Sequence, residues 1–126
     1  MNVFDDTVTE FGRSIGIDEL RLRPHGGTTL AIAAIGTLSF DLAGPGQDAV
    51  VISLTRPTPS TTATDPRQLL RLAHHKQPAP MPVHVGAFRD QIVAAAVLPR
   101  EDFTLARINE VILLLDRRHQ SLDSVR

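Results

Sequence analysis

Five histidines are the residues of this chain most able to bind a metal, and their spacing decides whether any two can do so together. His74 and His75 are adjacent, so on a helix they point about 100° apart and cannot form the i, i+4 pair that holds zinc. His25, His84 and His119 fall in different predicted elements without a ligand-like spacing. The chain has no cysteine, which excludes thiolate ligands, disulfides and a cysteine nucleophile. We therefore expect no metal and no cofactor.

Two carboxylate pairs, Asp5-Asp6 and Glu101-Asp102, are the candidates for general acid–base chemistry. Both pairs stand where the apolar pattern starts a helix, and acidic side chains stabilise the exposed N–H groups of a helix start. The sequence has no G-x-S-x-G turn, and its glycines match neither common nucleotide-binding loop. These observations predict a protein that is not an enzyme.

The composition excludes several classes of partner. Thirteen basic residues oppose fourteen acidic ones, so the net charge of −1 creates no field that attracts nucleic acid or an anionic membrane. Trp and Tyr are absent, which leaves little on which bases could stack. No apolar run approaches the roughly 18 residues of a membrane span, and the first residues do not form a signal peptide. We expect a cytoplasmic protein that binds neither nucleic acid nor membranes.

Hydrophobic periodicity divides residues 1–126 into the elements of one domain. Helical stripes predict helices over about 2–15, 66–76 and from about 104 to 115 or beyond. Alternating apolar residues predict strands near 30–34, 38–42, 50–54, 83–87 and 92–98. The order is α-β-β-β-α-β-β-α, which predicts an α+β fold with a twisted antiparallel sheet and helices packed against it. The Pro-, Ser- and Thr-rich stretch 55–64 is predicted to be a loop.

More apolar surface is predicted than one core needs. The leucines of the second helix do not share one narrow stripe, and two strands carry apolar residues on both faces. Such a surplus suggests a dimer or a protein-binding groove. A monomer in which both faces are covered remains the alternative. The residues concerned are Leu69, Leu70 and Leu72 on the helix, and Val51, Val93 and Val97 on the strands.

Over nearly its whole length the chain resembles the class I chaperones of bacterial type III secretion, the Tir-chaperone-like family. The resemblance is carried by the order of the elements and by the apolar patterns within them. These patterns are the opening helix with Phe4, Val8 and Phe11, the strands 30–32, 38–42 and 50–54, the segment 69–74, the hairpin 83–98 and the closing helix 105–115.

The resemblance implies a homodimer that has no enzymatic activity. It would bind the N-terminal segment of a secreted effector in an extended form and keep it soluble and secretion-competent. Such a ligand adds main-chain hydrogen bonds at a sheet edge while its side chains enter apolar pockets. The implied dimer interface is Leu69, Leu70, Leu72, Val83 and Val85. The implied effector-binding residues are Phe4, Val8, Leu38, Phe40, Leu42, Val50, Ile52 and Leu54.

Two other functions stay open. One is a different protein-binding or regulatory module on a similar scaffold, which would dimerise without binding secreted proteins. The other is a small enzyme or ligand-binding protein, which requires titratable groups that converge on a pocket. His84, Arg89 and Asp90 are the first place to look for such a site.

Overall fold

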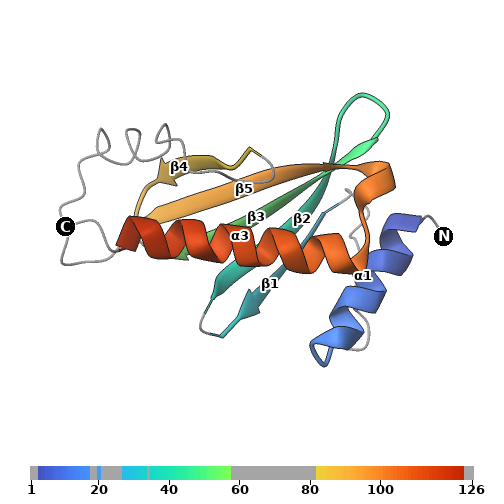
Figure 1. The fold of residues 1–126 in the computed structure, drawn as a ribbon, viewed down its shortest axis with the longest axis horizontal. Coiled ribbons are helices and arrows are strands. Elements are labelled where there is room, and N and C mark those ends of the chain that lie inside the picture. Colours follow the sequence, from blue (N-terminus) through green and yellow to red (C-terminus); the bar gives the residue numbers. More distant parts are fainter. Residues whose placement is uncertain (1–2, 18–19, 21–26, 34, 58–81, 124–126) are drawn as a thin grey trace.

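The computed structural model describes residues 3–17, 20, 27–33, 35–57 and 82–123. In it a five-stranded antiparallel sheet carries two helices on one face (Figure 1), which confirms the predicted α+β class. The predicted helix at 66–76 lies outside the described residues. The elements are α1 (Val3–Ser14), β1 (Gly27–Ile32), β2 (Gly36–Ala43), β3 (Ala49–Pro57), β4 (His84–Phe88), β5 (Gln91–Pro99), a 3₁₀ turn η1 (Arg100–Asp102) and α3 (Leu105–Asp123).

The strands lie in the order β1-β2-β3-β5-β4. The first three form the predicted meander, with Leu38 opposite both Leu30 and Leu54. β5 then lies between β3 and β4 and is antiparallel to both, so β3 and β4 run in the same direction. The longest strands, β3 and β5, are therefore at the centre of the sheet.

The start of β2 depends on a glycine. Gly36 has φ +125°, a conformation that side chains of L-residues rarely adopt. A Cβ at this position would also stand 2.5 Å from the carbonyl oxygen of Thr55 on β3. The absence of a side chain here lets β2 approach β3 closely enough to begin pairing at its first residues.

The core lies between the sheet and the two helices. Alternate residues of β2, β3 and β5 are buried there, as their period of two predicts. Four of the five phenylalanines meet in this layer: ring centroids are 5.4 Å apart for Phe4–Phe103 and Phe11–Phe40, and 6.0 Å for Phe40–Phe103. Since the chain lacks Trp and Tyr, these rings are its largest apolar side chains, and they join α1, β2 and the residue that follows η1.

A second glycine lets the chain turn back against α1. Gly12 is buried in the helix, and a Cβ there would lie 2.7 Å from Leu20 Cβ and 2.9 Å from the carbonyl oxygen of Ile17. The Thr9 hydroxyl donates to the Leu20 carbonyl at 3.1 Å, and Ile17 N–H donates to the Gly12 carbonyl at 2.7 Å. Gly12 lowers helix propensity, but it creates the space in which this segment packs.

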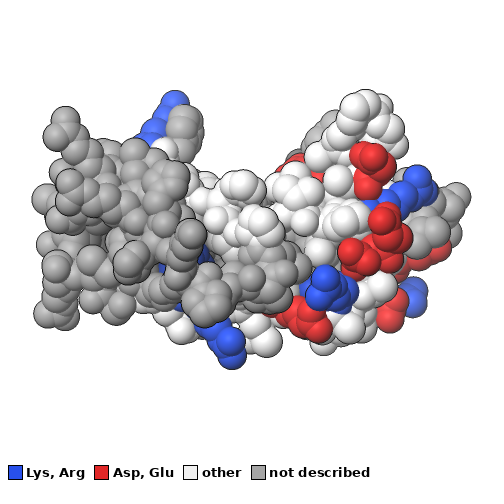
Figure 2. Space-filling model, turned by 45° about the horizontal axis from the view of Figure 1, so that its top comes forward, with Lys and Arg blue, Asp and Glu red and all other residues white. Residues whose placement is uncertain are grey.

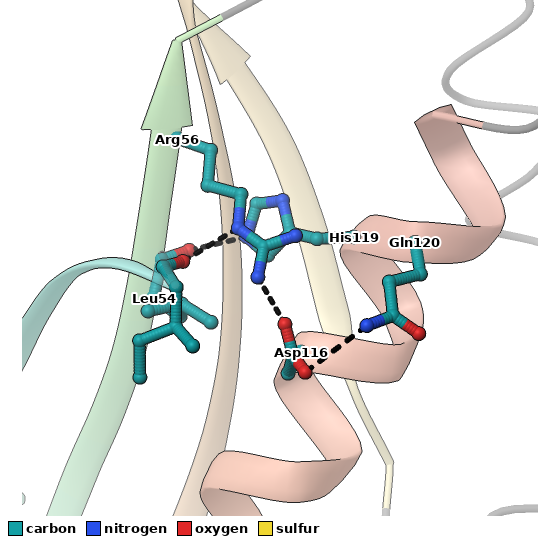
Figure 3. Close-up of polar contacts among 6 residues, drawn as sticks. Leu54, Arg56, Asp116, His119 and Gln120 are labelled. Atoms are coloured by element: carbon teal, nitrogen blue, oxygen red, sulfur yellow. Dashed lines mark hydrogen bonds and ion pairs between the residues drawn. The ribbon is translucent and has the colours of Figure 1, made fainter. Parts of the chain in front are cut away.

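Polar contacts fix the second half of α3 against β3 (Figure 3). His119 is 1% exposed, and its Nε2 donates to the carbonyl oxygen of Leu54 at 2.6 Å. Arg56 forms an ion pair with Asp116, which also accepts from the Gln120 amide at 3.2 Å. Buried polar groups need such partners. His119 is therefore a structural histidine in a locally paired site.

Candidate functional site

The residues proposed for small-molecule chemistry do not converge. His84 begins β4 opposite Ala95, whereas Arg89 and Asp90 form the exposed turn after the far end of that strand. Four strand steps, roughly 13 Å, separate the two ends. Within the described part of the chain, no three His, Asp or Glu side chains are grouped to hold a metal ion. The geometry thus gives no support to a site at these three residues.

The first carboxylate pair occupies a helix start, as predicted, whereas the second lies in a short 3₁₀ turn and the first turn of α3 has no acidic residue. Asp5 and Asp6 lie in the first turn of α1, and Glu101 and Asp102 belong to η1. The start of α3 is capped by Thr104, whose hydroxyl accepts from the N–H of Arg107 at 3.3 Å. Figure 2 shows acidic and basic side chains interspersed around the end of the molecule that carries α1. Mixed charges of this kind produce no strong field of either sign.

The predicted effector-binding residues lie on the inner face of the sheet and on the side of α1 that covers it. Seven are buried in the core and Leu42 is half-buried against it. A ligand can reach the seven only if α1 or α3 moves away, and packing by itself accounts for their burial. Their contact with an effector remains a prediction. The seven are Phe4, Val8, Leu38, Phe40, Val50, Ile52 and Leu54.

The predicted dimer-interface residues fall into two groups. Leu69, Leu70 and Leu72 lie outside the described residues. Val83 and Val85 are half-buried and pack against the edge of the core, where Val85 is paired with Ala94 of β5. They retain some exposed surface at the β4 edge, but their place in an interface also remains a prediction.

Among the described elements, α1 and α3 both lie on the inner face of the sheet (Figure 1), so no described helix covers the outer face. Towards β1 and β2 this face is polar, and the hydroxyl groups of Thr29 and Ser39 lie 3.1 Å apart. Towards β3 and β5 it is aliphatic. We call the residues Val51, Val93, Ala95 and Val97 the aliphatic strip; Val51 is directly opposite Val97, which is 48% exposed.

Most of the aliphatic strip could be identified from the periodicity of the sequence. The sequence placed Val51, Val93 and Val97 on the face opposite the core, and the alternation of buried and exposed residues in β3 and β5 confirms that placement. Ala95 was missed because alanine is small and carries little pattern. The sequence could still have indicated it, since it lies midway between Val93 and Val97 with the same period of two.

Solved structures with the same fold cover nearly the whole chain. The Yersinia pestis type III secretion chaperone SycH, solved with a fragment of YscM2, has a TM-score of 0.69 and 13% identity, covering 94% of this chain and 98% of that one. The HopA1–SchA chaperone–effector complex gives 0.68 and 16%, covering 90% of each chain. The ExsC–ExsE complex gives 0.73 and 18%, covering 94% and 91%.

No protein-family model and no curated protein matches the sequence. None of the described helices is long and apolar enough to cross a membrane. The likeness to solved structures is thus one of fold, at sequence identities too low to show more. This chain has the fold of the type III secretion chaperones, as its element order predicted.

Proposed function

We propose that this chain is a class I type III secretion chaperone, which binds the N-terminal segment of a secreted effector and keeps it soluble and secretion-competent. The observation that carries the proposal is the fold shared along nearly the whole chain with structures solved as chaperone complexes. The proposed activity is binding without catalysis, in the cytoplasm, with no cofactor.

The accessible surface suits an extended ligand. Among the described strands β1 and β4 form the two edges of the sheet, and an edge strand presents unpaired backbone N–H and C=O groups. A segment that adds to an edge gains main-chain hydrogen bonds whatever its sequence, and its alternate side chains contact one face of the sheet. The aliphatic strip supplies apolar contacts on that face.

The proposal includes a homodimer. Val83 and Val85 at the β4 edge, together with Leu69, Leu70 and Leu72, are its proposed interface. Light scattering at micromolar concentration tests it: the expected mass is twice 13.7 kDa. A strictly monomeric chain would remove the dimer from the proposal.

The decisive experiment is co-expression of the tagged chain with the proteins encoded beside its gene, followed by pull-down. We expect one neighbour-encoded secreted protein to be retained, and expect its N-terminal fragment to be sufficient for retention. Retention that requires only the folded remainder of that protein would contradict the proposal. Recovery of a protein that is not secreted would favour the other protein-binding module instead.

A further inference from the structure

The last turns of α3 are attached to the sheet by polar contacts. Up to Leu115 the helix packs against the core through fully buried aliphatic side chains. Beyond Leu115, among the side chains that the structure describes, His119 is the one that is buried. Its bond to the Leu54 carbonyl and the Arg56–Asp116 ion pair join this part of the helix to β3 (Figure 3). The attachment of these turns therefore depends in part on one titratable ring.

The site of His119 suits the neutral form of its ring. The residue is 1% exposed, and an imidazole out of contact with water loses the hydration that stabilises its charge. The 2.6 Å bond from Nε2 to the Leu54 carbonyl requires one N–H, which the neutral ring can carry on Nε2. The nearby end of the helix favours a positive charge by less than full burial disfavours it. The folded site thus holds the ring without a charge.

Charged residues of both signs occur close to the ring. Asp116 is three residues before His119, so it is on the same side of the helix, and it forms the ion pair with Arg56 of β3. Arg118, the residue before His119, is half-buried, and α3 ends four residues after the ring at Asp123. Because cations and carboxylates are equal in number here, the loss of hydration on burial decides which form of the ring the fold prefers.

The remaining charged groups around α3 lie away from the ring. β1 and β5 contain no ionisable residue, and those of β2 and β4, Asp41 and His84, are exposed on the outer face. Arg89 and Asp90 are opposite in charge and lie in the exposed turn between β4 and β5. Arg117 is exposed on α3, and α1 lies beside the opposite end of that helix (Figure 1). Within the described part of the chain, α3 and β3 therefore determine the charge balance at the ring.

We infer that His119 is a proton-sensitive latch: acidification charges its ring and loosens the turns of α3 beyond Leu115 from β3. An unfolded histidine takes up a proton at about pH 6.5, whereas the fold holds the neutral ring. The contribution of the latch to stability is therefore fully present above about pH 7 and falls as the pH drops below about 6.5. The inference does not depend on the proposed function.

The first test compares the parent chain with His119→Gln, whose amide N–H can replace the ring N–H at the Leu54 carbonyl but does not titrate. Urea unfolding at about pH 7.5 and about pH 5.5 gives the equilibrium constant for unfolding. Between these pH values we expect this constant to rise roughly tenfold more in the parent than in the variant, because one unfolded histidine takes up a proton. An equal rise, or a larger one in the variant, would contradict the latch.

His84→Gln is the matched control. His84 is exposed, so its ring is in contact with water in the folded chain as it is in the unfolded one. This variant should show the same rise in the unfolding constant as the parent, within about twofold. A rise reduced as far as in His119→Gln would mean that the effect does not come from the buried ring, and the inference would be wrong.

Amide hydrogen exchange locates the loosening without any substitution. After correction for intrinsic rates, the protection of residues 117–120 in the parent should fall at least about fivefold between the two pH values. The protection of Ile108 and Val111, in the first half of α3, should change by less than about twofold. Equal changes in both halves, or unchanged protection at residues 117–120, would overturn the inference even if His119→Gln failed to fold.

Discussion

The two faces of the sheet are built from alternate residues of the same strands, yet they differ in what covers them. On the inner face Leu38, Phe40 and Ile52 are fully buried under the helices. On the outer face their neighbours are hydroxyl residues at one side and the aliphatic strip at the other. Strand patterning therefore assigns residues to a face, but the covering elements decide whether an apolar face becomes part of the core.

The largest expected effect is on the inner face. Phe40→Ala removes a ring that contacts both Phe11 and Phe103, so we expect a loss of about 3–5 kcal/mol in the free energy of unfolding. Ser39→Ala, the next residue on the outer face, should change it by less than about 0.5 kcal/mol. Urea unfolding measures both. Equal losses in the free energy of unfolding would show that the two faces of the sheet contribute equally to stability.

The second comparison is between two histidines. His119→Ala removes a buried ring and leaves the Leu54 carbonyl without its donor, so we expect a loss of about 2–3 kcal/mol. His84 is exposed on the outer face, and His84→Ala should stay within about 0.5 kcal/mol. Thermal unfolding of the two variants gives the difference. A mild effect at His119 would show that the polar contacts under α3 contribute little.

A smaller effect is expected from ion pairs. Arg56–Asp116 is largely shielded, with side chains 16% and 21% exposed, whereas Arg107–Glu110 is exposed by 39% and 59%. Asp116→Asn should cost about 1 kcal/mol and Glu110→Gln close to nothing. Denaturant midpoints at low and high salt measure this. The reverse order would mean that α3 is not fixed at Asp116.

The smallest effect on stability is expected on the aliphatic strip. Val97→Thr keeps the shape of a half-exposed side chain, so the free energy of unfolding should fall by less than about 1 kcal/mol. Binding of the effector fragment should nevertheless weaken, since the strip loses apolar surface. Isothermal titration separates the two quantities. If Val97→Thr lowered the stability and left the affinity for the effector fragment unchanged, the strip would contribute to folding and not to binding.

The sequence predicted the class of the fold and the faces of its strands, because a period of two in 38–42 and 50–54 specifies which residues share a side. It did not predict which face the helices cover. The resemblance implied contact with an effector for Phe40 and Ile52, and the structure places both in the core under the helices. Contacts between distant residues, such as His119 with Leu54, leave no mark on local periodicity.

The extent of pairing between β4 and β5 was also beyond sequence reasoning. Pro82 has no N–H to donate, but only the observed register shows that β4 pairs with β5 from Gln91 to Ala95. Similarly, Gly12 reads as a weak point in a helix until the packing of Leu20 against it is known. Close approach between segments is a tertiary property, and a glycine pattern alone does not reveal its partner.

The insertion of β5 between β3 and β4 has a consequence for how the chain folds. The meander β1–β3 joins strands that are neighbours in sequence. By contrast, β3 and β5 can pair only when the intervening segment 58–90 has closed into a loop. Loop closure of this kind slows folding, so we expect refolding over milliseconds to seconds. Stopped-flow refolding tests this, and microsecond folding would contradict it. Until β5 has paired with β3, the β3 edge of a newly synthesised chain is exposed to other copies. A high concentration of such chains therefore favours aggregation.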